Sequence, residues 1–140
     1  MLLHIIARGK IGRGAERELL DRYVKRMAWP IRVTELPERG GTIPAPLSPL
    51  RTVALDERGR DLASRELAAV LGGWRDGGVR ETRLLIGAAD GHDAAVREQA
   101  DLLLAFGKAT WPHLLLRAML AEQLWRATSM IAGHPYHREG

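Results

Sequence analysis

A long run of apolar and small residues lies within Thr110–Glu139, which reads TWPHLLLRAMLAEQLWRATSMIAGHPYHRE. Pro112 suits the first turn of a helix, where its missing N–H costs no hydrogen bond, so we expect Thr110 or Trp111 at the cap. The residues that follow predict a helix as far as Ile131, with an apolar surface too wide for one face. Charged residues interrupt this run too often for it to span a membrane.

A helix of this kind is buried on more than one side. Within one small domain, we expect one side to face the core and the other to face a second subunit. Gly133 and Pro135 end the helix, and the tail His134–Glu139 holds two imidazoles, a phenol and a guanidinium. Terminal residues are usually frayed and featureless, so this composition predicts that the tail is functional.

Length and composition indicate one ordinary domain. The sequence has 140 residues, which predicts a single domain over 1–140. It contains no cysteine, which excludes disulfides, thiol catalysis and thiolate metal sites. Met1–Ile6 is apolar but too short for a signal peptide and has no basic leader, so we expect a cytoplasmic protein. The net charge of +4 permits binding to nucleic acid without requiring it.

The apolar pattern alternates between strand-like and helix-like segments along the chain. Strands are expected at Leu2–Ala7, Ile31–Leu36, Thr52–Leu55, Arg83–Ile86 and, as a short strand or extended loop, Leu102–Phe106. Helices are expected at Glu16–Met27, from about Arg65 to Trp74 after a Ser64 cap, over Asp93–Asp101, and in the last apolar run. We expect Glu57–Arg60 to turn the chain and the proline-rich Pro37–Pro49 to form a loop. This alternation predicts an α/β fold, with a mostly parallel sheet and helices on both faces.

Ligands of such sheets bind in the loops beyond the carboxyl ends of the strands. The candidate loops here are Gly9–Gly14, Asp56–Arg60, Gly87–Gly91 and Phe106–Trp111. Two of these four loops, Gly87–Gly91 and Phe106–Trp111, lie in the second half of the chain, so we expect the ligand site there.

Two of these loops are rich in glycine. Gly87–Gly91 is either a tight strand-to-helix turn or a place where the backbone comes close to a ligand. Gly9–Gly14 contains Lys10 and Arg13, and is either a solvated basic turn or a contact for phosphate or an RNA backbone. Neither loop has the spacing of a Walker motif or of a dinucleotide fingerprint.

Other candidate chemistry is weak when the residues are taken alone. His134, His137 and Glu139 make a poor metal site, because Pro135 lies among them and no helical H-E-x-x-H is present, so we expect no metal. His113, near a helix start, is more typical of a structural hydrogen-bonding residue than of a base. Glu122 and Arg126 stand four residues apart and are expected to pair.

The last apolar run also carries a family resemblance. Pro112-His113, Leu120–Ala127 (LAEQLWRA) and His134–Glu139 (HPYHRE) resemble the C-terminal signature of the ribosomal RNA large subunit methyltransferase H family. These are SPOUT-class enzymes that methylate N3 of a pseudouridine in 23S rRNA. The match is a long ordered string and is therefore specific.

Earlier segments resemble the same family in the right order. Leu3–Lys10 resembles its opening strand and Gly-Lys, Val53–Asp56 with Gly59 its central strand and turn, and Leu85–Gly87 with Gly91 its glycine loop. The chain departs from the family pattern at Ala88-Ala89-Asp90, where a second glycine and an acidic Pro-Glu-Gly are usual. It also departs at Pro37–Pro49, which replaces a helix and is too rich in proline to form one.

The resemblance implies a SPOUT-type parallel sheet with a C-terminal trefoil knot, an exception to the rule that chains do not thread loops. It implies that S-adenosylmethionine is the cofactor and that the knot loops hold it. The cofactor contacts carried over from the family are Leu55, Gly87, Phe106, Gly107, Lys108, Ala109, Thr110 and Trp111.

The resemblance also implies a homodimer, in which the tail of one subunit (within residues 131–140) reaches the cofactor pocket of the other. The groups placed near the reacting base are His134, Tyr136, His137 and Arg138. The implied substrate is the helix 69 pseudouridine of 23S rRNA within the assembled 70S ribosome. The alternative is a non-catalytic RNA- or nucleotide-binding α/β module.

Overall fold

The structure is a computed structural model, and it describes residues 1–133. The strands are β1 (Leu2–Arg8), β2 (Ile31–Leu36), β3 (Leu50–Asp61), β4 (Glu81–Ile86) and β5 (Leu102–Ala105). The helices are α1 (Ala15–Arg26), α2 (Ser64–Asp76), α3 (Ala94–Gln99) and α4 (His113–Ile131). The predicted alternation of strands and helices is therefore confirmed.

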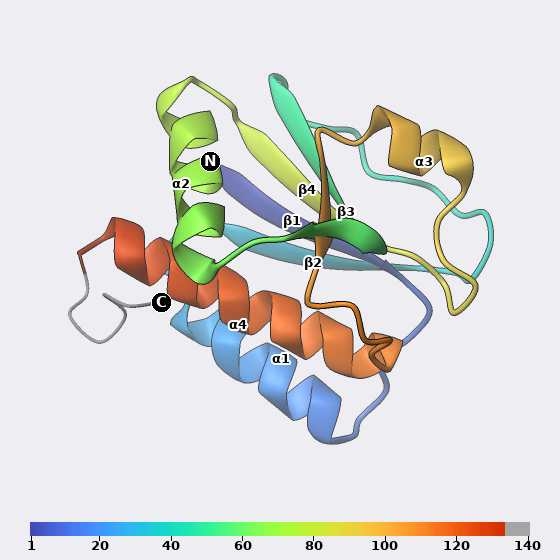
Figure 1. The fold of residues 1–140 in the computed structure, drawn as a ribbon. Helices are drawn as coiled ribbons and strands as arrows, with labels where there is room; N and C mark the ends of the chain where they lie inside the picture. Colours follow the sequence, from blue (N-terminus) through green and yellow to red (C-terminus); the bar gives the residue numbers. More distant parts are fainter. Residues whose placement is uncertain (134–140) are drawn as a thin grey trace.

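The strands form one five-stranded sheet in the order β2-β1-β4-β3-β5 (Figure 1). Every pairing between these strands is parallel; Ile5 of β1, for example, lies beside Val33 of β2 and Leu84 of β4. The carboxyl ends of the strands therefore meet at one edge of the sheet. The predicted parallel α/β architecture is confirmed.

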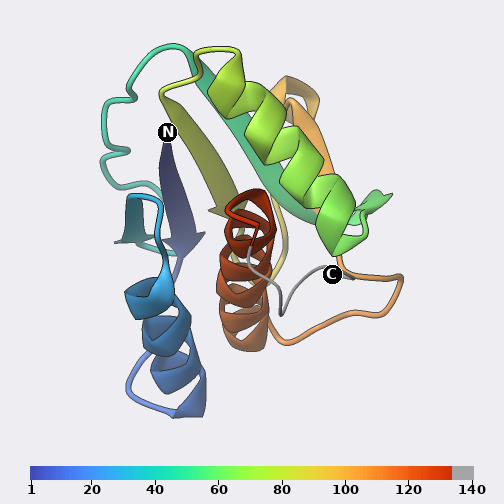
Figure 2. The same ribbon diagram turned by 90° about the vertical axis from the view of Figure 1, so that its left-hand side faces the viewer.

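Helices α1, α2 and α4 cover one face of the sheet, with α4 between the other two (Figures 1 and 2). Leu20 of α1, Leu71 of α2 and Leu124 of α4 are buried there against the sheet. Helix α3 lies on the far side and contributes no buried residue. Helices therefore occupy both faces, but only one face carries a helical layer.

No residue of α4 is fully exposed, as its composition predicts. Part of this burial comes from the same chain, because α1 and α2 pack along its two flanks. On its surface, Arg126 donates to Glu122 at 2.8 Å, which confirms the predicted pair. Its own chain thus supplies cover on both flanks of this helix, and the expected contact with a second subunit stays a prediction.

The proline-rich segment 37–49 forms the predicted loop and is held to the far side of the sheet by buried polar groups. The Glu81 carboxylate accepts from the Leu47 N–H at 2.9 Å and from Arg83 Nε at 2.6 Å, and it contacts His4 Nδ1 at 2.9 Å. Arg83 also donates to the carbonyl of Pro44. These bonds satisfy charges that would be costly if buried unpaired.

One predicted turn is wrong. Glu57–Arg60 belongs to β3, which continues to Asp61 and pairs with β5 again after an irregularity between Leu55 and Arg60. Gly59 allows this continuation, since a Cβ there would lie 2.6 Å from the backbone carbon of Leu103. The polar side chains suggested a turn because the strand leaves the core and they point to solvent.

The two predicted helix caps are also wrong. Helix α2 has Ala63 at its N-cap, where the backbone N–H donates to Glu66 Oε1 at 2.8 Å. The Ser64 hydroxyl is buried instead and donates to Gln123 at 2.6 Å. Helix α4 begins one residue later than expected, at His113, with Pro112 at the N-cap because its backbone is still extended.

Candidate functional site

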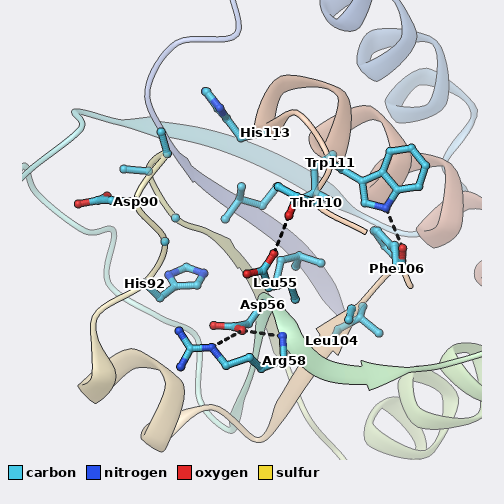
Figure 3. A pocket seen from close by; sticks show the side chains of 18 of the residues that line it. Leu55, Asp56, Arg58, Asp90, His92, Leu104, Phe106, Thr110, Trp111 and His113 are labelled. Atoms are coloured by element: carbon cyan, nitrogen blue, oxygen red, sulfur yellow. Dashed lines mark hydrogen bonds and ion pairs between the residues drawn. The ribbon is translucent and has the colours of Figure 1, made fainter. Parts of the chain in front are cut away.

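A cavity of about 290 Å³ opens at the carboxyl edge of the sheet (Figure 3). Its walls come from three neighbouring strands or the loops after them: the second half of β3 from Leu55, the loop Gly87–His92 after β4, and the loop Phe106–Trp111 after β5. Apolar Leu104 and Ile86 form part of its floor, and carboxylates lie at its rim. The cavity lies at the edge of the sheet where the sequence predicted a ligand site, and its lining combines two loops of the second half of the chain with residues 55–58 of the first half.

The structure brings seven of the eight expected cofactor residues together around this cavity. They are Leu55, Gly87, Phe106, Gly107, Ala109, Thr110 and Trp111. Lys108 does not line it, and its side chain is exposed on the outside of the same loop. The expected role of these residues in holding a cofactor stays a prediction.

The loop after β4 is the tight turn that the sequence allowed, and it also forms a cavity wall; a close approach of its backbone to a ligand stays a prediction. The N–H of Gly91 donates to the carbonyl of Ala88 at 2.8 Å, and Gly91 has φ +88°. A Cβ at Gly87 would lie 2.9 Å from the backbone carbon of Gly91. Ala88 fits without strain, since no non-glycine residue in the described part of the chain has a positive φ.

The loop after β5 is tied to the extended end of β3. The N–H of Gly107 donates to Asp61 at 2.9 Å, and the Thr110 hydroxyl donates to Glu57 at 3.0 Å. Trp111 donates from Nε1 to the carbonyl of Phe106 at 2.8 Å, which closes the loop on itself (Figure 3). The β3 extension that sequence analysis missed is therefore what positions one wall of the site.

His92 is a candidate that sequence analysis missed, although it directly follows the glycine loop. Its Nε2 lies 3.0 Å from the carbonyl of Leu85, which can only accept a hydrogen bond, so Nε2 carries the proton and Nδ1 remains an acceptor. Burial lowers the pKa of His92, against the opposing effects of the Leu85 carbonyl and of Asp56. The imidazole is therefore neutral near pH 7 and lines the cavity.

Asp56 is the most enclosed carboxylate of the cavity, with a side chain only 8% exposed. It accepts from the backbone N–H of Arg58 at 2.9 Å, and its oxygens lie 3.7 Å from Arg58 Nε and 3.9 Å from Arg97 Nε. The two arginines flank Asp56 at the limit of ion-pair distance. The negative charge of Asp56 is therefore shared with two cations of the same cavity.

His113 also lines the cavity, at the first residue of α4. Among residues 1–133 it has no hydrogen-bond partner, so the interpretation of His113 as a structural hydrogen-bonding residue is wrong. The ring is half-buried beside the cavity because α4 starts here rather than earlier.

A second cavity, of about 560 Å³, lies on the other side of the loop Gly87–His92. Its opposite wall is made of Arg8, at the end of β1, and of residues 38–40. Arg8 donates from Nη1 to the carbonyls of Pro37 and Gly40, at 3.0 and 2.6 Å. The two cavities thus share one loop at one edge of the sheet.

The four expected catalytic residues, His134, Tyr136, His137 and Arg138, lie outside the described residues. Within residues 1–133, no group of three or more histidine, aspartate or glutamate side chains is arranged to hold a metal ion. None of the helices in that part is long and apolar enough to cross a membrane.

Comparison with known proteins agrees with this geometry. A family model described as "Predicted SPOUT methyltransferase" matches residues 1–137. A protein of Novosphingobium aromaticivorans named ribosomal RNA large subunit methyltransferase H is 74% identical over 141 residues, covering 100% of both chains. Proteins of the same name from Erythrobacter litoralis and Zymomonas mobilis are 67% and 57% identical, again over 100% of both chains.

The family model covers nearly the whole chain, and the named relatives align with it from end to end. Both findings agree with the parallel sheet and with the cavity at its carboxyl edge. The chain therefore belongs to the SPOUT methyltransferases and, among them, to the ribosomal RNA large subunit methyltransferase H family.

Proposed function

We propose that the protein is an S-adenosylmethionine-dependent methyltransferase acting on N3 of the helix 69 pseudouridine of 23S rRNA, in the assembled 70S ribosome. The observation that carries the proposal is the cavity built from the second half of β3 and from the loops after β4 and β5. Its lining includes seven of the eight positions that the family resemblance assigns to the cofactor. The names of full-length relatives support ribosomal RNA as the substrate.

The cavity suits S-adenosylmethionine chemically. Leu55, Leu104 and Phe106 offer apolar surface to an adenine ring, and the Asp56 carboxylate, which lines the same cavity, offers acceptor oxygens to a polar group of the ligand. Gly87 leaves the wall without a side chain where a Cβ would meet the backbone of Gly91. When bound, the cofactor would supply an electrophilic methyl group on a sulfonium.

The substrate nitrogen is an imide N–H, which is a poor nucleophile until its proton leaves. The protein must hold the base against the methyl group and assist that departure. We place His134, Tyr136, His137 and Arg138 around the base. In this arrangement Arg138 stabilises the negative charge that develops on the imide.

We further propose that residues 1–140 act as one SPOUT domain with a C-terminal trefoil knot, and that residues 131–140 form its functional tail. Two such chains would form a cytoplasmic homodimer in which the tail of one subunit serves the cavity of the other. Trp111 supports an interface near the cavity, since its large apolar side chain is 42% exposed at the rim.

The deciding experiment is transfer of a labelled methyl group from S-adenosylmethionine to ribosomes that lack the modification, followed by mapping of the product nucleotide by mass spectrometry. The proposal expects methyl on N3 of the helix 69 pseudouridine. Transfer to another nucleotide would overturn the substrate assignment. Absence of both transfer and cofactor binding would favour a non-catalytic RNA- or nucleotide-binding module.

A further inference from the structure

A buried arginine holds the start of the turn Gly9–Gly14, between β1 and α1, in place by hydrogen bonds. Arg117 of α4 is 0% exposed, and its Nη2 donates to the carbonyls of Arg8 and Gly9 at 2.7 and 2.9 Å. Its Nη1 donates to Glu35 Oε2 at 3.0 Å. Burying a guanidinium is costly unless its partners are close and well placed, so these contacts fix the start of the turn strongly.

Other bonds hold the same turn to β2. The N–H of Ile11 donates to Glu35 Oε2 at 2.7 Å, and the N–H of Gly9 donates to the carbonyl of Leu36 at 2.7 Å. Gly9 has φ +86°, and a Cβ there would lie 2.8 Å from Glu38 Oε1. These hydrogen bonds therefore give the turn a fixed shape, and it is not a loose solvated loop.

This arrangement leaves two cations of the turn without internal partners. Lys10 and Arg13 are exposed, and neither forms an ion pair with any residue of the described part of the chain. Glu35, which lies beneath the turn, is neutralised from inside by Arg117, and Glu38 also lies close to that guanidinium. The Glu16 carboxylate lies at the end of the turn, 3.2 Å from where a Cβ of Gly14 would stand, but it pairs with neither cation within residues 1–133, so both remain available to an external anion.

The turn lies at the same edge of the sheet as the candidate methyl-transfer site. β1 is the neighbour of β4, so the turn follows one strand and the cavity loop Gly87–His92 follows the next (Figure 1). Arg8, just before the turn, lines the second cavity together with that loop. An RNA strand with a nucleotide in the site would pass close to this edge.

We propose that the turn Gly9–Gly14 is a docking surface for the RNA backbone, on which Lys10 and Arg13 pair with phosphates flanking the target nucleotide. Rigidly held cations position a nucleic acid by its phosphates and carry no base specificity. This inference rests on the proposed function, because it takes ribosomal RNA as the substrate. It adds to that function a contact surface outside the cavity and the tail.

The test compares two double variants of equal charge change. Lys10→Gln/Arg13→Gln removes the cations of the turn, whereas Arg22→Gln/Lys25→Gln removes two exposed cations farther along α1 that form no ion pair within residues 1–133. Binding of each protein to ribosomes lacking the modification is measured directly at several salt concentrations. Binding of S-adenosylmethionine is measured in parallel as a check of the fold.

Each lost phosphate contact lowers the slope of log affinity against log salt by roughly 0.7–0.9. The slope of the turn variant should therefore be smaller in magnitude by about 1.4–1.8. Raising the salt from 50 to 200 mM should then weaken its binding to ribosomes roughly tenfold less than it weakens wild-type binding, while the control keeps the wild-type slope. Equal slopes for the turn variant and the wild type would overturn the inference. Measuring binding directly tests the docking surface separately from the proposed function. If the wild-type protein binds ribosomes but transfers no methyl group, the proposed function fails and the docking surface can still be tested.

Discussion

Arg117 of α4 and Arg8 of β1, which are 109 positions apart in the sequence, are joined by a 2.7 Å hydrogen bond from the buried guanidinium to the Arg8 carbonyl. The same guanidinium reaches Glu35 of β2. One side chain of the last helix therefore ties together the ends of the first two strands. Its Nε is the one buried side-chain polar atom without a partner among residues 1–133.

Replacing Arg117 with methionine should destabilise the fold strongly. The Arg8 and Gly9 carbonyls would lose their buried donor, and the Glu35 carboxylate, whose side chain is 34% exposed, would lose its ion pair, so we expect a cost of about 1–3 kcal/mol. Urea unfolding measures the change. Arg126→Met on the same helix is the matched control, since the Arg126 side chain is 31% exposed, against 1% for Arg117, and its pair with Glu122 should be worth under about 1 kcal/mol. Similar losses in both variants would contradict this account of Arg117.

Gly59 should tolerate no side chain. Gly59→Ala would place a Cβ 2.6 Å from the backbone of Leu103, so β3 and β5 must separate, at a cost of about 1–3 kcal/mol. Gly73→Ala is the control, because nothing lies within 4 Å of its Cβ and alanine favours the helix α2 by up to about 1 kcal/mol. Thermal unfolding should move in opposite directions for the two variants; a stabilised Gly59→Ala protein would contradict the close approach.

Much of the fold could be predicted from local patterns, since periods of apolar residues reveal strands and helices and their alternation reveals a parallel sheet. The continuation of β3 through Glu57–Arg60 could not, because polar residues with a glycine have the composition of a turn. Nor could the cap at Ala63, where the Glu66 side chain supplies the bond that a serine was expected to supply. Contacts of this kind join segments that come together only in the folded chain, so a local sequence pattern does not predict them.

The candidate site, too, could be predicted from the sequence only in part. Its position followed from the topology of the sheet, and most of its lining followed from the family resemblance. His92 was missed because its environment depends on a Leu85 carbonyl seven residues away and on burial, which no sequence motif reports. Lys108 was included because the family's loop was carried over as a run, whereas the loop turns this one side chain outward.

Stability should fall as the pH drops from 7.5 to 5. Burial lowers the pKa of His4 below its usual value, while the Glu81 carboxylate opposes this effect without reversing it. The unfolded chain then binds more protons than the folded chain, so the free energy of unfolding rises with pH up to the ordinary histidine pKa. Each such histidine contributes a slope of at most about 1.4 kcal/mol per pH unit in that window.

The measurement is urea unfolding of the wild type and of His4→Gln across this range. The glutamine cannot titrate, so the variant should show a flatter dependence on pH, while His92, whose pKa is also lowered by burial, retains its own share. The pKa of Glu81 is lowered too, mainly through hydrogen bonds that outweigh its burial, so a further loss is expected only below that window. Identical slopes for wild type and variant would rule out His4 as a source of the effect.

Cofactor binding should distinguish Gly87 from Lys108. A Cβ at Gly87 would force the loop away from Gly91 and change the cavity wall, so Gly87→Ala should weaken S-adenosylmethionine at least tenfold. Lys108→Ala should leave the affinity within about twofold, since that side chain does not line the cavity and exposed substitutions change energies by only about ±0.5 kcal/mol. The rise in unfolding temperature on adding the cofactor measures binding for both variants, because a cofactor at about one hundred times its Kd adds about 2.7 kcal/mol to the free energy of unfolding. A large loss in Lys108→Ala would restore that residue to the site.

Arg138→Ala should abolish methyl transfer and leave cofactor affinity unchanged, because the proposed role of the guanidinium is to stabilise the imide anion rather than to bind the cofactor. Arg17→Ala, which removes an exposed arginine paired with Asp21 on α1, is the control and should keep full activity. Mixing the Arg138→Ala and Gly87→Ala proteins then tests the dimer. If the tail of one subunit serves the cavity of the other, mixed dimers contain one site with both parts intact, and partial activity returns. Unchanged turnover by Arg138→Ala alone would remove this residue from the mechanism, and no recovery on mixing, with subunit exchange verified, would place the tail in the cavity of its own chain.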